Sequence, residues 1–98
     1  MRRIPFGIIG CGLMGREFAS AAARWMHLTD MRARPEIIAV CDTNPALMGW
    51  YADNLPSVRQ QATDYRELLA NPEIEAIYCA VPHVLHADIY PDIIASGK

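Results

Sequence analysis

The chain has 98 residues, of which 52% are hydrophobic and 20% are charged, and this balance is typical of an ordinary globular domain. Because this length supports one core, we expect residues 1–98 to form a single domain. The net charge is -2 and the lysines and arginines are scattered, which argues against nucleic acid or an acidic membrane surface as a partner.

Features of the sequence also bear on the compartment. The basic start and the apolar residues after it resemble a secretion signal, but the apolar stretch before Cys11 has only about six residues and a signal needs about seven or more. No stretch approaches the roughly 20 apolar residues of a membrane span. Cys11, Cys41 and Cys79 form no CxxC pair and are odd in number, which favours buried thiols over disulfides or a metal site. We therefore expect a cytoplasmic protein.

The chain begins with the pattern of a strand, a helix and a second strand. Residues 4–9 are apolar and are followed by a glycine, which predicts a strand buried in a parallel sheet. From residue 13 to about residue 27, apolar residues recur at steps of three and four, which predicts an amphipathic helix. We expect a loop around residues 29–35 and a second strand over the apolar, β-branched run 36–41.

Shorter elements follow. Asn44 has the position of a helix N-cap and Pro45 that of the first helical turn, so we expect a helix from there to residue 55. Residues 58–61 predict a short, polar edge strand. The spacing of Asp64 and Glu67 predicts a capping box that opens a brief helix.

The last strand is predicted at residues 74–81, and the last helix is predicted to end before Gly97. Pro91 indicates where this helix begins, because proline in a helix interior costs about 3 kcal/mol but is harmless in the first turn. The helix would then start near Asp88 as its N-cap, with residues 82–86 as a non-helical loop that faces a ligand. A kinked helix that starts at His83 is the alternative.

Strands that alternate with helices predict an α/β fold, a Rossmann-type parallel sheet of about four strands with helices on both faces. In the usual order of such sheets, the fourth strand lies beside the first. Ligands bind at that point, outside the carboxyl ends of the strands.

A glycine-rich turn lies between the first predicted strand and the first predicted helix. It fits the pattern G-x-G-x-x-G over Gly10, Cys11, Gly12, Leu13, Met14 and Gly15. In this pattern the first glycine permits the tight turn, the second lets the backbone approach a pyrophosphate, and the third lets helix and strand pack closely. The free amides of Leu13 and Met14 would then meet phosphate oxygens at the positive end of the helix dipole. The alternative is a glycine-rich turn without a ligand.

An acidic residue follows the second strand. Asp42, with Thr43 beside it, lies where a carboxylate can accept hydrogen bonds from both hydroxyls of an adenine ribose. Its negative charge would repel a 2′-phosphate, which favours NAD as the cofactor and leaves NADP possible. Alternatively, Asp42 belongs only to the turn before Pro45.

The end of the fourth strand supplies a second wall for the same site. Ala80, Val81, Pro82 and His83 lie there, and His86 follows. We expect the ribose or nicotinamide of a dinucleotide beside them. The two histidines have no nearby third ligand, so we expect them to be polar loop residues and not a metal site.

Together, these segments resemble the family of glucose-fructose oxidoreductase, inositol dehydrogenase and rhizopine-catabolism dehydrogenase (Gfo/Idh/MocA), over essentially the whole chain. The likeness is carried by residues 6–15, 40–45, 64–69, 74–77, 81–83, His86 and 95–98. Two residues depart from the family pattern T-P-N, because Val81 lacks the hydroxyl of threonine and His83 replaces asparagine.

The resemblance implies an NAD- or NADP-dependent dehydrogenase that moves a hydride between nicotinamide and a sugar, polyol or related hydroxyl or carbonyl compound. It also implies that the catalytic lysine follows Lys98, so no catalytic residue is expected in residues 1–98. The remaining Rossmann strands and the substrate domain are expected outside these residues too, and we expect a homo-oligomer for the complete protein. The alternative of another class is a non-catalytic Rossmann module that senses a nucleotide.

Overall fold

The computed structural model describes residues 2–23, 33–81 and 83–98, with side chains placed for residues 3–22, 34–81 and 88–98. The elements in chain order are β1 (Arg2–Ile9), α1 (Leu13–Ala23), β2 (Ala33–Cys41), the 3-10 helix η2 (Pro45–Leu47), α2 (Gly49–Asn54), β3 (Gln60–Ala62), α3 (Tyr65–Leu69), β4 (Ala76–Cys79) and α4 (His83–Ser96).

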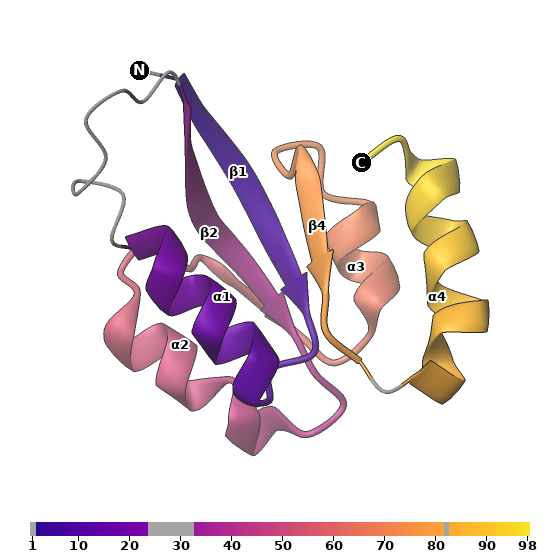
Figure 1. Ribbon diagram of the computed structural model, residues 1–98, viewed down its shortest axis with the longest axis horizontal. Coiled ribbons are helices and arrows are strands. Elements are labelled where there is room, and N and C mark those ends of the chain that lie inside the picture. The colour runs from indigo at the N-terminus through magenta and orange to yellow at the C-terminus, as the bar shows by residue number, and fades with distance from the viewer. Residues whose placement is uncertain (1, 24–32, 82) are drawn as a thin grey trace.

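The four strands form one parallel sheet in the order β3-β2-β1-β4. The α/β prediction is therefore confirmed, and β4 lies beside β1 as expected. Helices α1 and α2 cover one face of the sheet, while α3 and α4 cover the other (Figure 1). The turns that follow β1, β2 and β4 gather at the lower end of the molecule in Figure 1.

Neighbouring residues of the strands point to opposite faces and build two cores. Ile8 and Val40 pack under α1 and α2 with the buried Tyr51, whereas Ile9 and Ile38 pack under α3 and α4. Burial on both faces explains why these strands read as continuous apolar runs. The sheet is therefore the rigid middle layer from which the turns at its carboxyl end project.

The short elements agree with the predictions in kind but not in every boundary. Asn44 caps η2 and Asp64 caps α3, each by accepting a hydrogen bond from the amide two residues on. The helix expected from Pro45 begins as η2 and continues as α2 from Gly49. The expected edge strand is confirmed at the edge of the sheet, as β3.

The crossover before β2 is shorter than expected. Residues 33–35 belong to β2 and pair with residues 2–4 of β1, so the part of the expected 29–35 loop from Ala33 onward was predicted wrongly. Pairing along β1 holds these residues in the sheet, although Pro35 lacks an N–H to donate. The rest of that loop lies outside the described residues.

The preferred start of α4 was also predicted wrongly, and the alternative start at His83 is the one observed. The helix runs from His83 to Ser96 with Pro91 inside it, so residues 83–86 are helical and Asp88 is not an N-cap. Pro91 is exposed, and it lacks the N–H that would bond to the carbonyl four residues back. Ile89 and Ile93 are buried on either side of the proline, and burial worth about 1.5–3 kcal/mol for each side chain offsets its cost.

Candidate dinucleotide-binding site

A pocket of about 500 Å³ opens at the carboxyl ends of the strands. It is lined by Ile9, Gly10, Gly12, Cys41, Asp42, Thr43, Leu47, Thr63, Tyr65, Ala80, Val81 and Ile89. We call it the carboxyl-end pocket. It lies at the point where the strand order reverses between β1 and β4, the usual ligand site of such sheets.

Gly10 makes the turn that leaves β1. Its φ of +98° lies in the left-handed region, and a Cβ there would be 2.6 Å from the carbonyl oxygen of Ala80. The Gly10 N–H still donates to the carbonyl oxygen of Cys41 at 2.8 Å, so the turn stays attached to β2. Only glycine satisfies this backbone angle and the close approach of β4 together.

Gly12 and the start of α1 face open space. A Cβ on Gly12 would have no atom within 4 Å, and the first helical hydrogen bond runs from the Arg16 N–H to the Gly12 carbonyl. The amides of Leu13 and Met14 precede that bond and are therefore free of helical acceptors. The side chains of Leu13 and Met14 are more than half exposed, at 62% and 56%. Backbone donors with room in front of them suit an anion.

Gly15 packs α1 against the layer beneath it. A Cβ at this position would collide with the carbonyl oxygen of Gly10 and lie 2.5 Å from the hydroxyl of Tyr51. The predicted close packing of helix on strand at Gly15 is therefore confirmed. The Tyr51 hydroxyl is buried and has no hydrogen-bond partner among the described residues.

Asp42 connects two of the turns that form the pocket. Its Oδ2 accepts a hydrogen bond from the Cys11 N–H and its Oδ1 accepts one from the Asn44 N–H, both at 2.8 Å. The Asp42 N–H donates to the Ala62 carbonyl of β3 at 3.2 Å. The turn that the sequence offered as an alternative role for Asp42 is present, but it does not account for the bond to Cys11.

The thiols of the site are kept protonated. Burial raises the pKa of both Cys11 and Cys41 to about 12, and the negative charge of Asp42 adds to the effect. Burial also raises the pKa of Cys79, and all three cysteines are free. The expectation of buried thiols without disulfides is confirmed for Cys11 and Cys41, whereas Cys79 is half-buried. None has the lowered pKa of a reactive cysteine.

Six of the thirteen predicted site residues line the carboxyl-end pocket, whereas Cys11, Leu13, Met14 and Gly15 of the glycine turn are not among its lining residues. Gly10, Gly12, Asp42 and Thr43 line the pocket from one side, and Ala80 and Val81 line it from the other. Pro82 lies outside the described residues. His83 and His86 lie in the first turn of α4, and their side chains are outside the described part.

Sequence reasoning missed six lining residues, of which Ile9 and Cys41 are the last residues of β1 and β2. Leu47 follows the Asn44 cap, Thr63 and Tyr65 follow β3, and Ile89 comes from α4. The usable signal was the rule that carboxyl ends of parallel strands meet at one edge, which brings the residues after β3 beside Asp42. Tyr65 also donates a hydrogen bond to Asp92, which ties α3 to α4 beside the pocket.

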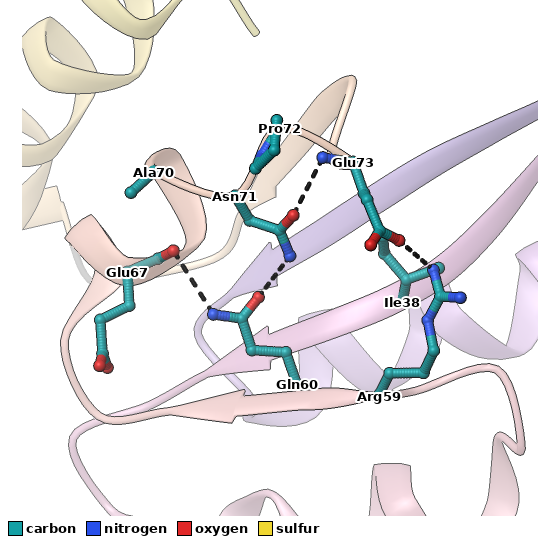
Figure 2. Close-up of a pocket in the computed structure, with 8 residues that line it drawn as sticks. All are labelled: Ile38, Arg59, Gln60, Glu67, Ala70, Asn71, Pro72 and Glu73. Carbon is teal, nitrogen blue, oxygen red and sulfur yellow. Dashed lines mark hydrogen bonds and ion pairs between the residues drawn. The ribbon is translucent and has the colours of Figure 1, made fainter.

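A second pocket, of about 420 Å³, lies near the amino ends of β3 and β4 (Figure 2). We call it the amino-end pocket. Its polar side chains are paired with one another, as Arg59 contacts Glu73 at 2.6 Å and the Asn71 side-chain amide donates to Gln60 at 2.7 Å. Figure 2 also shows that the Glu73 N–H donates a hydrogen bond to the side-chain oxygen of Asn71. These groups are therefore occupied in holding the turn before β4.

Metal sites and membrane spans are both absent from the part of the chain that the structure describes. Among the side chains placed for residues 3–22, 34–81 and 88–98, no group of three or more acidic, cysteine or histidine residues has the arrangement of a metal site. Within residues 2–23, 33–81 and 83–98, no helix has the length and apolar character needed to cross a bilayer.

Comparison with protein families gives one match that spans nearly the whole chain. The family is described as an oxidoreductase family with an NAD-binding Rossmann fold, and its model matches residues 4–98. An inositol 2-dehydrogenase/D-chiro-inositol 3-dehydrogenase of Lactiplantibacillus plantarum is 26% identical over 92 residues, which are 94% of this chain and 25% of that protein.

Solved structures of similar proteins have the same fold. An NAD binding oxidoreductase from Klebsiella pneumoniae is 32% identical with a TM-score of 0.84, over 98% of this chain and 26% of that one. A levoglucosan dehydrogenase in complex with NADH and L-sorbose is 28% identical with a TM-score of 0.87, over 100% of this chain and 26% of that one. The chain therefore spans about a quarter of the length of the relatives that it matches.

Proposed function

Because the chain belongs to the oxidoreductase family with an NAD-binding Rossmann fold (Gfo/Idh/MocA), we propose that its carboxyl-end pocket holds NAD in a dehydrogenase. The substrate is a sugar, a polyol or a related hydroxyl or carbonyl compound. This substrate class is supported by the names of the relatives, an inositol dehydrogenase and a levoglucosan dehydrogenase. These relatives also favour an enzyme over a non-catalytic nucleotide sensor.

The observation that carries the proposal is the juxtaposition of the Asp42 carboxylate with the glycine turn. The bond from the Cys11 N–H to Asp42 holds the two together, while the space over Gly12 and the first amides of α1 remain open. A dinucleotide needs this pairing, because its pyrophosphate takes backbone donors and its adenine ribose takes a carboxylate acceptor. The pocket residues thus fit the group that the family binds.

In this proposal, six residues of the glycine turn hold the pyrophosphate and Asp42 with Thr43 holds the adenine ribose. The turn residues are Gly10, Cys11, Gly12, Leu13, Met14 and Gly15. The strand end at Ala80, Val81 and Pro82, with His83 and His86, lies toward the nicotinamide half. Bound NAD supplies the hydride acceptor, and these residues bind and orient it.

The proton-transfer residue is proposed to lie outside residues 1–98. Of the described side chains that line the pocket, those of Cys41, Asp42 and Tyr65 are ionisable. Cys41 is kept neutral by its raised pKa, Asp42 accepts two amide hydrogen bonds, and Tyr65 donates to Asp92. This occupation supports a separate acid–base residue in the complete protein.

The charge of the pocket supports NAD over NADP. Asp42 is acidic, and the described residues that line the pocket include neither arginine nor lysine to receive a 2′-phosphate. At close range, two negative charges in a site of reduced dielectric repel each other by more than they would in water. The pocket therefore selects the dinucleotide with the free 2′-hydroxyl.

We further propose that residues 1–98 are the N-terminal part of a longer enzyme with a separate substrate domain, which acts as a homo-oligomer in the cytoplasm. The length of the relatives supports the additional domain. The three free thiols support a reducing compartment.

Calorimetric titration with NAD, NADP and ADP tests the proposal. We expect NAD and ADP to bind, and NADP to bind at least tenfold more weakly because of Asp42. Equal affinity for the two dinucleotides would refute the role of Asp42 in selection. Absence of binding for all three ligands would refute the assignment of the pocket.

A further inference from the structure

The Asp42 carboxylate makes contacts that recognition of a ribose does not require. Its Oδ2 receives the Cys11 N–H across 31 positions of sequence, and its Oδ1 receives the Asn44 N–H two positions on. The first bond reaches the glycine turn after β1, and the second closes the turn after β2. One side chain thus joins the two turns that frame the carboxyl-end pocket.

The Cys11 amide needs this partner. Cys11 is fully buried between Gly10 and Gly12, and its N–H belongs to a bond that is only partly accessible to solvent. An unpaired backbone donor in such a place costs free energy, so buried amides are almost always paired. The Asp42 carboxylate supplies the acceptor, and its charge makes the bond stronger than a neutral one.

Backbone hydrogen bonds hold the main chain at Asp42 and at the residue before it. The Asp42 N–H is bonded to Ala62 of β3, and the preceding residue, Cys41, accepts the N–H of Gly10. Asp42 therefore has little freedom to follow a moving turn.

We propose that Asp42 is a positioning residue for the glycine turn, which it holds in the form that receives a pyrophosphate before any dinucleotide arrives. The identity of the ligand rests on the proposed function, whereas the holding of the turn does not. Each carboxylate oxygen has acceptor capacity for a second hydrogen bond, so the same side chain can hold the turn and still accept ribose hydroxyls.

Because Asp42 has both roles, its replacement changes the affinity for NAD and for NADP in different ways. Replacing Asp42 with a neutral residue removes the charge that repels a 2′-phosphate, but it also releases the Cys11 amide. The two effects oppose each other for NADP, whereas for NAD the release of the amide adds to the loss of the ribose contact. Affinity for NAD therefore falls by more than loss of the ribose contact alone would cause, and NADP gains little.

The decisive variant is Asp42→Asn. Its side-chain oxygen can accept only one of the two amides, and its NH₂ group then faces the other, donor against donor. We expect the melting temperature of the ligand-free protein to fall by roughly 5 °C and exchange of the Cys11 amide, followed by NMR, to accelerate at least tenfold. We also expect about tenfold weaker binding of 2′,3′-dideoxy-ADP, a probe that lacks the hydroxyls of the ribose contact.

Asp64→Asn is the matched control. Asp64 also follows a strand, but both of its side-chain hydrogen bonds, from the N–H and the Nε–H of Arg66, go to Oδ1, which asparagine retains, and Asp64 does not line the pocket. We expect its affinity for dideoxy-ADP and its Cys11 exchange to equal those of the wild type.

The outcomes separate the two proposals. Unchanged Cys11 exchange and unchanged dideoxy-ADP affinity in Asp42→Asn, with ADP weakened, would mean that Asp42 acts on the ribose alone and would overturn the positioning role. If Asp42→Asn does not fold, the ligand-free wild type decides, since its Cys11 amide must exchange more slowly than those of Leu13 and Met14. Faster Cys11 exchange in the variant without any nucleotide binding to the wild type would keep the positioning role and reject the proposed function.

Discussion

The carboxyl-end pocket and the amino-end pocket are similar in size and differ in what their polar groups do. In the amino-end pocket, Arg59 is paired with Glu73 and Gln60 with Asn71, so the side chains satisfy one another (Figure 2). At the carboxyl-end pocket, Gly12 lines the wall and is followed by amides of α1 that precede the first helical hydrogen bond, and the Asp42 oxygens retain acceptor capacity. Polar groups that remain available for hydrogen bonds at the end of the sheet can bind a ligand. Polar groups that are paired with one another instead stabilise the turn in which they lie.

The sharpest way to break the carboxyl-end pocket is Gly10→Ala. The substitution forces a side chain into the left-handed region and places Cβ 2.6 Å from the Ala80 carbonyl, so we expect the free energy of unfolding to fall by roughly 3 kcal/mol in a urea titration. Gly97→Ala is the control, because its φ is +81° but its surroundings are open. We expect a loss of about 1 kcal/mol there. Equal losses would show that the approach of β4 imposes no constraint on the turn.

Alkaline pH should weaken the carboxyl-end region next. The folded pKa of Cys11 and Cys41 is about 12 and the ordinary value is 9.0, so the unfolded chain loses these protons first. Below pH 9 the two thiols contribute their full stabilisation. Between pH 9 and 12 the free energy of unfolding falls by about 1.4 kcal/mol per pH unit for each thiol. Urea titrations at pH 8, 9 and 10 measure this slope. A slope that survives in the double variant Cys11→Ala, Cys41→Ala would assign it to other groups.

Gly12→Val separates binding from folding in the same turn. A Cβ at Gly12 has no protein atom within 4 Å beyond its chain neighbours, so we expect the free energy of unfolding to change by less than about 1 kcal/mol. The same side chain would occupy the space of the pyrophosphate, so affinity for NAD should fall well over tenfold by calorimetry. Gly49→Ala is the matched control at an open glycine outside the pocket, and its affinity should not change. Wild-type affinity in Gly12→Val would mean that the turn does not approach the ligand.

Much of the carboxyl-end pocket could be predicted from the sequence. Continuous apolar runs indicated strands buried on both faces, and the glycines at positions 10, 12 and 15 between strand and helix indicated the turn and its packing. The place of the fourth strand beside the first followed from the usual strand order of such sheets. These features are local or obey general rules, so the sequence alone suffices for them.

Other features depended on contacts between distant residues. The bond between the Cys11 amide and Asp42 joins two turns, and no pattern of residue types encodes it. The start of α4 at His83 was only the alternative prediction because the rule for Pro91 states a local cost, while tertiary burial of Ile89 and Ile93 opposes it. Tyr65 lines the pocket because of where α3 lies in the fold. Helix propensity predicts that a helix forms but not where it lies.

The smallest expected effect belongs to the amino-end pocket. Arg59→Ala removes an ion pair whose two side chains are exposed, at 64% and 63%, and exposed pairs contribute less than about 1 kcal/mol. We expect a small loss of stability that shrinks further in 0.5 M salt, since salt screens exposed charges. Calorimetry should give wild-type affinity for NAD, because Arg59 lies near the amino end of β3 and does not line the carboxyl-end pocket. A tenfold change in that affinity would contradict the distinction between the two pockets. It would mean that Arg59, which holds the turn before β4, also belongs to the binding site.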